Sequence, residues 1–329
     1  MLGAGAIGGY VGAALARGGA DVTLIARGAH LAAMRTGGVR VLSGRGDFVA
    51  HPEVTDELAA VAAADVVFVA LKAYSLPEVA PRLGELLLPD AAVIWAQNGI
   101  PWWYFQSLPD EGAGGSAGIG GLESVDPGGV IARSISPEHN VGCVVYCSTE
   151  IIEPGVIKHI EGTRFTLGEP DGSVTERCKL ISAALAAGGL KAPVEARLRD
   201  QIWLKLIGNV AFNPTTALTR ATLGELGTVP EMVDLLRAVF AECAQVADRL
   251  GIRFPVSLDR RLEAGLAVGD HRTSMLQDLE AGKRLELDCM TGAVVELADR
   301  LGIAVPHVRT VHACATLLDQ LNRDRLKIS

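Results

Sequence analysis

A glycine-rich turn at the start of the chain constrains its fold more than any other feature. Gly3, Gly5 and Gly8 form the pattern Gly-x-Gly-x-x-Gly, a helix-forming run follows over residues 10–17, and "DVTLIA" then has the character of a strand. By itself the pattern could mark an ordinary flexible turn, but in a unit of this size it predicts a βαβ dinucleotide-binding motif. The pyrophosphate would lie against the helix N-terminus. The expected cofactor contacts are Gly3, Gly5, Ala6, Ile7 and Gly8.

The end of the second strand favours one nicotinamide cofactor over the other. An NAD site has an acidic residue there to bind the ribose 2′-hydroxyl. Here the strand ends in Ala26-Arg27-Gly28, and a cation at this point suits a 2′-phosphate. Arg27 could instead be an ordinary surface residue, but its place in the motif favours the functional interpretation. The sequence therefore predicts NADPH/NADP+ as the cofactor, with Arg27 at the 2′-phosphate.

The first strand is unusually short, because only Met1 and Leu2 precede the first glycine. A strand that leads into such a turn normally has about five residues. This strand is central in doubly wound sheets, so its absence would leave backbone donors and acceptors on its neighbours unpaired. We expect the native chain to start several residues further upstream.

Two further buried strands end in polar residues. "ADVVFVALK" ends at Lys72 and "AAVIWAQN" ends at Asn98. In open α/β sheets, ligands bind outside the carboxyl ends of the strands. We therefore expect Lys72 to reach a cofactor phosphate, and Asn98 to reach the nicotinamide or the substrate. The aromatic run "PWWYF" at residues 101–105 fits either local packing or a pocket wall.

The pattern changes from about Asn140. Two antiparallel strands are predicted around the turn at residues 153–155, followed by a helix near 178–187 and a further strand in "GLKAPVEA". A helix then begins near Arg197, and the rest of the chain has helical character. The predicted fold class is α/β, with a Rossmann-type dinucleotide-binding domain over residues 1–196 and an all-helical C-terminal domain over residues 197–329.

The stretch "WLKLIGNVAFNPTTALT", residues 203–219, is an apolar helix that carries Lys205, Asn209 and Asn213 four residues apart. That spacing places all three on one face. Any one of them could be satisfied by water or backbone. Three in register, together with helix-weakening Gly208 and Pro214, favour a binding site. Further on, Ser274 and Glu286 lie twelve residues apart, a spacing that fits a solvated helix face as well as a site.

The chain resembles the ketopantoate reductase family along nearly its whole length. The matching segments follow the family order: "GAGAIGG", "LIARG", "LKAY", "QNG", "EPGVIKH", "WLKLIGNVAFNPTTALT" and "SMLQDLEAGKRLELD". The resemblance implies an NADP-binding Rossmann-type domain, an all-helical domain and an active site in the cleft between them. It also implies reduction of ketopantoate (2-dehydropantoate) to (R)-pantoate with NADPH, in the route to pantothenate and coenzyme A.

The resemblance also implies roles for individual residues. Lys205 matches the catalytic lysine of the family, and Glu286 matches its active-site carboxylate. Substrate-contacting positions match Asn98, Asn209, Asn213 and Ser274, and cofactor-phosphate positions match Arg27 and Lys72. Lys205, Asn98, Ser274 and Glu286 are expected to converge on one cleft between the two domains. The aromatic run and the glycine-rich stretch at residues 112–121 depart from the plain family pattern, so the exact 2-oxo acid stays open.

The composition limits which partners, metals and cellular compartments are expected for this protein. A net charge of −8 gives no reason to expect nucleic acid as a partner, and the apolar runs are far too short for a membrane span. The six cysteines form no Cys-x-x-Cys pair, so we expect core residues in a reducing compartment, no structural metal and a cytoplasmic protein. A homodimer is plausible. Two alternatives stay open, namely a reductase of another branched 2-oxo acid and a non-catalytic NADP-binding sensor.

Overall fold

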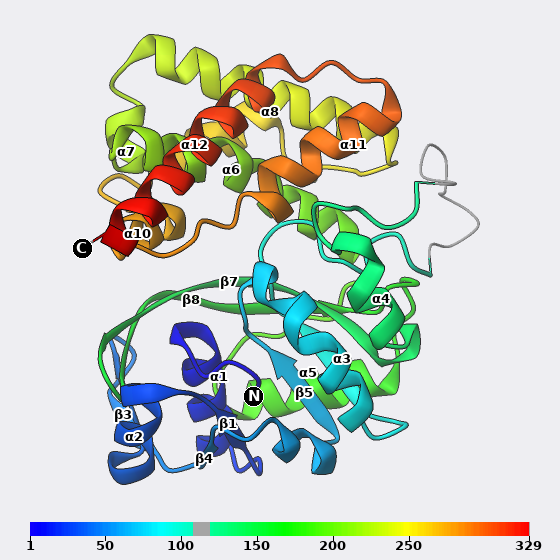
Figure 1. The fold of residues 1–329 in the computed structure, drawn as a ribbon, viewed down its shortest axis with the longest axis vertical. Helices are drawn as coiled ribbons and strands as arrows, with labels where there is room; N and C mark the ends of the chain where they lie inside the picture. Colours follow the sequence, from blue (N-terminus) through cyan, green and yellow to red (C-terminus); the bar gives the residue numbers. More distant parts are fainter. Residues whose placement is uncertain (108–118, 329) are drawn as a thin grey trace. The chain divides into compact units, whose positions relative to one another are not determined.

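The computed structural model describes residues 1–107 and 119–328, which form two compact units (Figure 1). The sheet unit comprises Met1–Gln97 and Gly128–Leu198, and the helical unit comprises Asn98–Pro127 and Arg199–Ser329. The chain therefore enters the helical unit after Gln97, returns to the sheet unit at Gly128, and enters the helical unit a second time at Arg199. The predicted domain limits, 1–196 and 197–329, stay a prediction. The predicted fold class, a Rossmann-type domain with a helical C-terminal domain, is confirmed.

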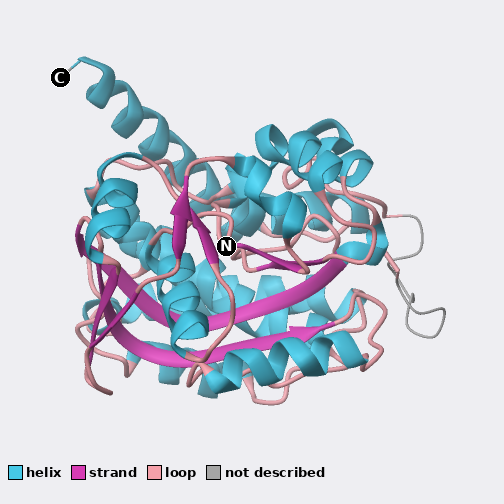
Figure 2. Ribbon diagram, turned by 90° about the horizontal axis from the view of Figure 1, so that it is seen from below, coloured by secondary structure: helices cyan, strands magenta, loops and turns pink. Residues whose placement is uncertain are grey.

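The strands of the sheet unit form two hydrogen-bonded groups. The larger has the order β3-β2-β8-β7-β6-β5, and the smaller is β1-β4. The β2–β3 and β7–β8 pairs are antiparallel, and the other pairs are parallel. Figure 2 shows how far the two long strands β7 and β8 curve. The bounds are β1 (Thr23–Ile25), β2 (Val39–Ser43), β3 (Phe48–Ala50), β4 (Glu53–Thr55), β5 (Val66–Val69), β6 (Ala92–Trp95), β7 (Asn140–Glu153) and β8 (Val156–Gly168).

Leu2 joins the two groups into one sheet. It forms parallel bridges to Ile25 of β1 on one side and to Val69 of β5 on the other. Its N–H donates to the Phe68 carbonyl at 2.8 Å, and its carbonyl accepts from the Ala70 N–H at 2.9 Å. This short segment therefore pairs with both neighbours, and the glycine turn leaves the sheet between the carboxyl ends of β1 and β5.

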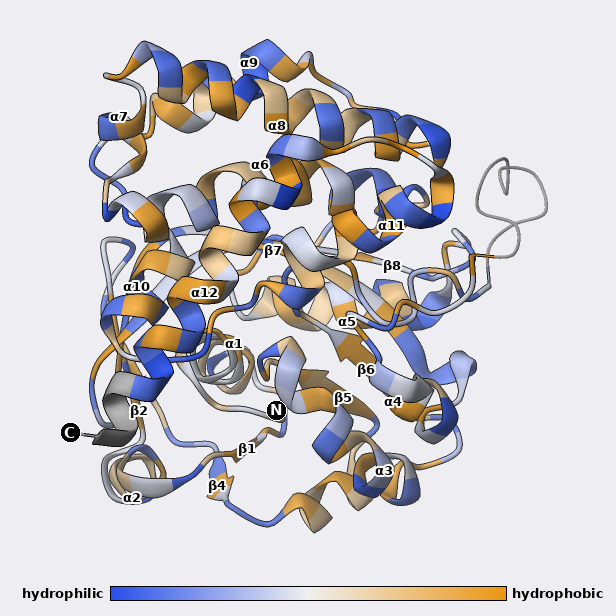
Figure 3. Ribbon diagram, turned by 45° about the horizontal axis from the view of Figure 1, so that its top comes forward, coloured by the Kyte–Doolittle hydropathy of each residue, from blue (hydrophilic) through white to orange (hydrophobic). Residues whose placement is uncertain are grey.

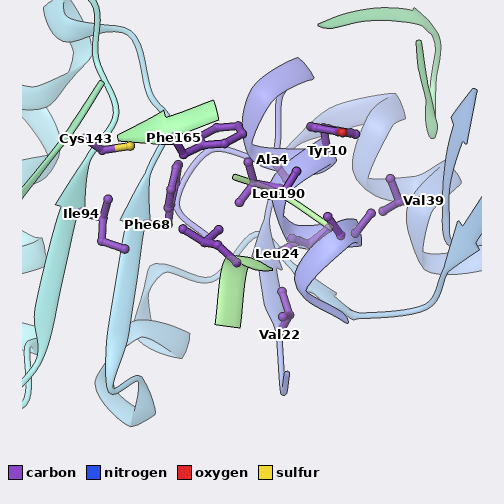
Figure 4. Packing of buried hydrophobic residues seen from close by; sticks show 14 of the residues in the cluster. Ala4, Tyr10, Val22, Leu24, Val39, Phe68, Ile94, Cys143, Phe165 and Leu190 are labelled. Carbon is purple, nitrogen blue, oxygen red and sulfur yellow. The ribbon is translucent and has the colours of Figure 1, made fainter. Parts of the chain in front are cut away.

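Helix α1 (Ala6–Arg17) packs on this sheet over an apolar core. Phe68 of β5 and Phe165 of β8 meet edge to face with their ring centroids 6.4 Å apart, and Tyr10 of α1 lies in the same cluster (Figure 4). The remaining helices of the unit are α2 (Gly28–Gly37), α3 (Leu76–Leu86), α4 (Val130–Ser134) and α5 (Glu176–Ala187), with 3₁₀ turns η1 (Leu58–Ala63), η2 (Ala73–Ser75), η3 (Pro127–Gly129) and η4 (Pro137–His139).

The strand predicted in "GLKAPVEA" is wrong in part. This segment follows β8 through two isolated bridges, Arg164 to Lys191 and Leu167 to Val194, rather than as a regular strand. The reason lies in Pro193, which accepts from the Leu167 N–H at 2.8 Å but has no N–H of its own to continue the ladder.

The helical unit contains no strand among its described residues. Along α8 (Pro230–Arg249) the buried positions Leu236, Val239, Phe240, Cys243 and Val246 recur at helical spacing, and Figure 3 shows hydrophilic residues between the hydrophobic ones. None of the helices, over the described part of the chain, is long and apolar enough to cross a membrane. The elements are α6 (Leu198–Thr219), α7 (Leu223–Leu226), α8 (Pro230–Arg249), α9 (Leu258–Leu266), α10 (Ser274–Glu280), the π-helical turn η5 (Asp288–Gly292), α11 (Ala293–Leu301) and α12 (Pro306–Ile328).

The cysteines mostly occupy the core, as expected. Cys143, Cys178, Cys243 and Cys289 are buried, and Cys147 is half-buried. The expectation is wrong for Cys314, which lies exposed on α12.

Candidate active site

The three glycines of the first turn have different surroundings. Gly3 has a φ of +93°, and a Cβ added at Gly8 would lie 2.2 Å from the Gly3 carbonyl oxygen. A side chain is therefore excluded at both positions by backbone geometry and packing. Gly5 differs, because a Cβ added there would meet nothing within 4 Å.

The open space at Gly5 lies at the N-terminus of α1. Gly5 is the N-cap residue, it provides no side-chain cap, and the first turn of α1 contains no acidic residue. The N–H groups at such a helix end favour an anion. An absent side chain facing open space at this end fits a bound pyrophosphate, which would approach the backbone of Gly5, Ala6 and Ile7.

Two cations follow the strands that flank this turn. Arg27 comes directly after β1 and Ala26, is exposed, and is the N-cap of α2, whose first turn has no acidic residue. Lys72 follows β5, is half-buried, and is the N-cap of η2. Since Leu2 bridges β1 and β5, both cations lie at strand ends next to the glycine turn. This arrangement suits a ligand with several phosphate groups.

Gln97 supports this region and was not singled out from the sequence. Its side-chain amide donates to the carbonyls of Val69 at 2.9 Å and Leu71 at 3.1 Å. Val69 is the last residue of β5 and Leu71 directly precedes Lys72, so the amide fixes the backbone that leads into Lys72. The segment "QNG" contains a signal for it, because Gln97 directly precedes Asn98 beyond a buried strand.

In the helical unit, the polar row lies along α6 as predicted. Lys205 and Asn209 are half-buried, and Asn213 is buried. The Lys205 ammonium donates to Asn98 Oδ1 at 2.7 Å. Asn213 Nδ2 lies 3.9 Å from the Met290 sulfur of η5. The structure therefore brings Lys205 together with Asn98, a residue more than a hundred positions earlier in the chain.

Asn98 is held in place by the two residues that follow it. Gly99 has a φ of +88°, and a Cβ added there would lie 2.2 Å from the Cys289 carbonyl oxygen. The Ile100 N–H donates to the same oxygen at 2.8 Å. The backbone after Asn98 thus docks directly on η5, a π-helical turn of a kind that often occurs at functional sites.

Glu286 lies two residues before η5 and is buried, with 6% of its surface exposed. The backbone next to Glu286 is also fixed, because the Leu285 N–H donates to Asp319 Oδ1 of α12 at 2.9 Å. Ser274 is exposed and is the first residue of α10. Asn98, Asn209, Asn213, Ser274 and Glu286 all belong with Lys205 to the helical unit, whereas Arg27, Lys72 and the glycine turn belong to the sheet unit.

The aromatic run packs against α6. Trp203 Nε1 donates to the Tyr104 hydroxyl at 2.8 Å, and Arg199 Nη2 donates to the Tyr104 carbonyl at 2.9 Å. Trp102 and Trp103 are buried as well, and burial raises the pKa of Tyr104. Local packing is therefore the interpretation that the contacts support. In the glycine-rich stretch, residues 112–118 lie outside the described residues.

The two histidines of α12 have structural partners. His307 Nδ1 lies 2.6 Å from Glu242 Oε1, and His312 Nδ1 lies 2.7 Å from Thr291 Oγ1. Burial lowers the pKa of His312. Across residues 1–107 and 119–328, no group of three or more His, Cys, Asp or Glu side chains is placed to hold a metal ion.

Comparisons with known proteins match both units. The family described as ketopantoate reductase PanE/ApbA matches residues 1–101, and its C-terminal counterpart matches residues 197–319. The 2-dehydropantoate 2-reductase of Mesorhizobium japonicum is 40% identical over 326 residues, which are 99% of this chain and 98% of that one. The 2-dehydropantoate 2-reductase of Archaeoglobus fulgidus is 31% identical over 316 residues, 94% of each chain. A PanE/ApbA family ketopantoate reductase from Ralstonia eutropha JMP134 has a TM-score of 0.84 at 27% identity, with 98% of each chain covered.

The contrast between Gly5 and Gly8 gives a direct test of the cofactor turn. In Gly5→Ala the free energy of unfolding should change by less than about 1 kcal/mol, because the methyl group enters open space at an N-cap. If a dinucleotide pyrophosphate binds beside Gly5, the affinity for the dinucleotide, measured with NADPH, should fall roughly tenfold or more, since the methyl group would enter that space. Gly8→Ala, the matched variant, should lower both stability and affinity. Denaturant unfolding and NADPH fluorescence titration measure the two effects, and unchanged NADPH affinity in Gly5→Ala would contradict the assignment.

Proposed function

Because the chain belongs to the ketopantoate reductase family, we propose that it reduces ketopantoate (2-dehydropantoate) to (R)-pantoate with NADPH. It would then be an oxidoreductase in the route to pantothenate and coenzyme A. The observation that carries the proposal is the 2.7 Å hydrogen bond from the Lys205 ammonium to Asn98. Lys205 lies on the same face of α6 as Asn209 and Asn213.

Lys205 is proposed as the general acid. When bound, a reduced nicotinamide would supply a hydride to the ketone carbon, so the residues around the ketone would have to stabilise the negative charge on its oxygen. A positioned cation next to that oxygen stabilises the charge, and the Lys205 ammonium can then transfer a proton to it. The bond to Asn98 holds the ammonium in one direction, because an amide oxygen accepts the hydrogen bond without removing the proton.

The remaining polar residues of the helical unit are proposed to bind the substrate. Asn209, Asn213 and Ser274 can donate to or accept from carboxylate and hydroxyl oxygens without adding charge. Glu286 is proposed as a catalytic residue that either orients Lys205 or accepts from a substrate hydroxyl. Its burial makes both roles effective, since a carboxylate interacts more strongly where water is excluded.

NADPH rather than NADH is proposed as the cofactor. The support is Arg27, an exposed cation that follows β1 where an NAD site would carry an acid. Lys72 is proposed at a second phosphate. A cytoplasmic location is proposed because none of the six cysteines lies in a disulfide, which suits a reducing compartment. A homodimer stays a prediction.

Steady-state oxidation of NADPH with ketopantoate, compared with NADH and with a panel of branched 2-oxo acids, tests the proposal. Highest kcat/KM with ketopantoate and NADPH is expected. A clear preference for another 2-oxo acid would identify the alternative reductase. Binding of NADPH without turnover of any 2-oxo acid would favour the alternative that the protein is a non-catalytic NADP-binding sensor.

Lys205→Ala should lower kcat by roughly 10²–10⁴ while leaving NADPH affinity unchanged, because the lost group acts on charge that develops during the reaction. Lys179→Ala is the control, since it removes an equally cationic but exposed side chain from α5. Turnover and NADPH titration of both variants measure the effect. Wild-type turnover in Lys205→Ala would exclude this residue as the acid.

Arg27→Asp should lower the ratio of kcat/KM for NADPH over NADH by about 10- to 100-fold. It removes a charged contact worth roughly 1.5–3 kcal/mol and places a carboxylate near the 2′-phosphate. Arg82→Asp on α3 makes the same change of charge at another exposed position and should leave the ratio unchanged. If both variants behave alike, the role of Arg27 is wrong.

A further inference from the structure

Two buried threonines connect the polar row of α6 to the start of α10. Thr216 lies on α6, one turn after Asn213, and Thr273 is the N-cap residue of α10. Their hydroxyl oxygens are 2.6 Å apart. Thr216 is 0% exposed and Thr273 is 5% exposed, so water does not compete for this bond. The next residue after Thr273 is Ser274.

The protons of this connection can be assigned. The Thr216 hydroxyl donates to the Asn213 carbonyl at 3.0 Å, so its single proton is used there. With that proton on the Asn213 carbonyl, Thr273 donates the bond between the threonines. Thr273 in turn accepts from the Leu276 N–H at 3.3 Å, which is the capping bond of α10. The result is a directed chain of hydrogen bonds from the first turn of α10 to the backbone of Asn213.

The bond matters because α6 is weakened at this point. Pro214 has no N–H, so the helix lacks one backbone bond directly after Asn213. Side-chain hydrogen bonds therefore help to set the position of the last turns of α6 relative to Lys205, Asn209 and Asn213. The loop before Thr273 has separate anchors, since the Leu223 N–H donates to the His271 carbonyl at 3.0 Å and the Gly224 N–H to the Gly269 carbonyl at 2.7 Å. Loss of the threonine bond should shift α10 without detaching the loop.

We propose that Thr216 and Thr273 are positioning residues that hold Ser274 in register with Asn213 for binding of the 2-oxo acid. This inference rests on the proposed function. Neither threonine touches the reacting atoms. Together they fix the distance between two substrate-binding positions on different helices, in the way that supporting hydrogen bonds fix ligands elsewhere.

Thr216→Val tests the proposal in the full-length enzyme. The methyl group keeps the shape of the side chain, but the Thr273 hydroxyl proton loses its acceptor, at a cost typical of a buried hydrogen bond. KM for ketopantoate should rise about 5- to 10-fold, while kcat and the KM for NADPH stay unchanged. Thr216→Ser should restore the wild-type KM. If the valine variant does not fold, Thr216→Ala carries the same expectation.

Thr215→Val is the matched control. Thr215 is a buried neighbour on the same helix, but its hydroxyl donates within α6, to the Ala211 carbonyl at 2.6 Å. This variant should keep the wild-type KM. An equal rise in KM for Thr215→Val would overturn the proposal, because it would trace the effect to general loss of packing.

A double-mutant cycle tests whether Thr216 acts through Ser274. Thr216→Val in a Ser274→Ala background should raise KM little beyond the value for Ser274→Ala alone. Fully multiplicative effects, or an unchanged KM in the single variant, would overturn the inference while leaving ketopantoate reduction intact. A wild-type enzyme that turns over no 2-oxo acid would instead overturn the proposed function, and this inference with it.

Discussion

The candidate active site depends on one backbone hydrogen bond, donated by Ile100 to the Cys289 carbonyl at 2.8 Å. It joins segments almost two hundred residues apart, and Gly99 makes it accessible because any side chain there would collide with the same carbonyl. The bond brings Asn98 onto the helical unit, where its amide oxygen meets the Lys205 ammonium. A residue that follows a strand of the sheet unit thereby becomes part of the site on α6.

Helix α6 acts as the frame for that site along its whole length. Its first turns are fixed by Arg199 and Trp203, which bond to the aromatic run at Tyr104. Its middle carries the lysine and the two asparagines. Its last turns, beyond Pro214, depend on Thr216 and its bond to α10. The helix therefore combines an anchored first part with a polar face, on which Lys205 and Asn209 are half-buried and Asn213 is buried.

Local sequence patterns predicted the helices and strands better than they predicted which distant segments contact one another. The glycine motif, the strand runs and the spacing of Lys205, Asn209 and Asn213 follow from neighbouring residues, and the corresponding helices and strands are present. The docking of Gly99 on Cys289 and the pairing of Thr216 with Thr273 join distant segments, which no local period encodes. Likewise, the interruption beside β8 depends on Pro193 meeting a particular partner strand. The functional roles came from family resemblance, because spacing alone left Glu286 and Ser274 undecided.

The distribution of buried polar groups distinguishes the two kinds of site in this protein. A polar side chain removed from water costs free energy unless it finds a partner. In the helical unit four of the buried polar residues lie on α6, at the start of α10 or close to η5: Asn213, Thr216, Thr273 and Glu286. In the sheet unit the proposed phosphate ligands are an exposed Arg27, a half-buried Lys72 and backbone donors beside an open glycine. This difference matches the proposed chemistry. A phosphate is bound at fixed charge and tolerates water, whereas an oxygen that gains charge during hydride transfer is stabilised most by donors that are already oriented and shielded from water.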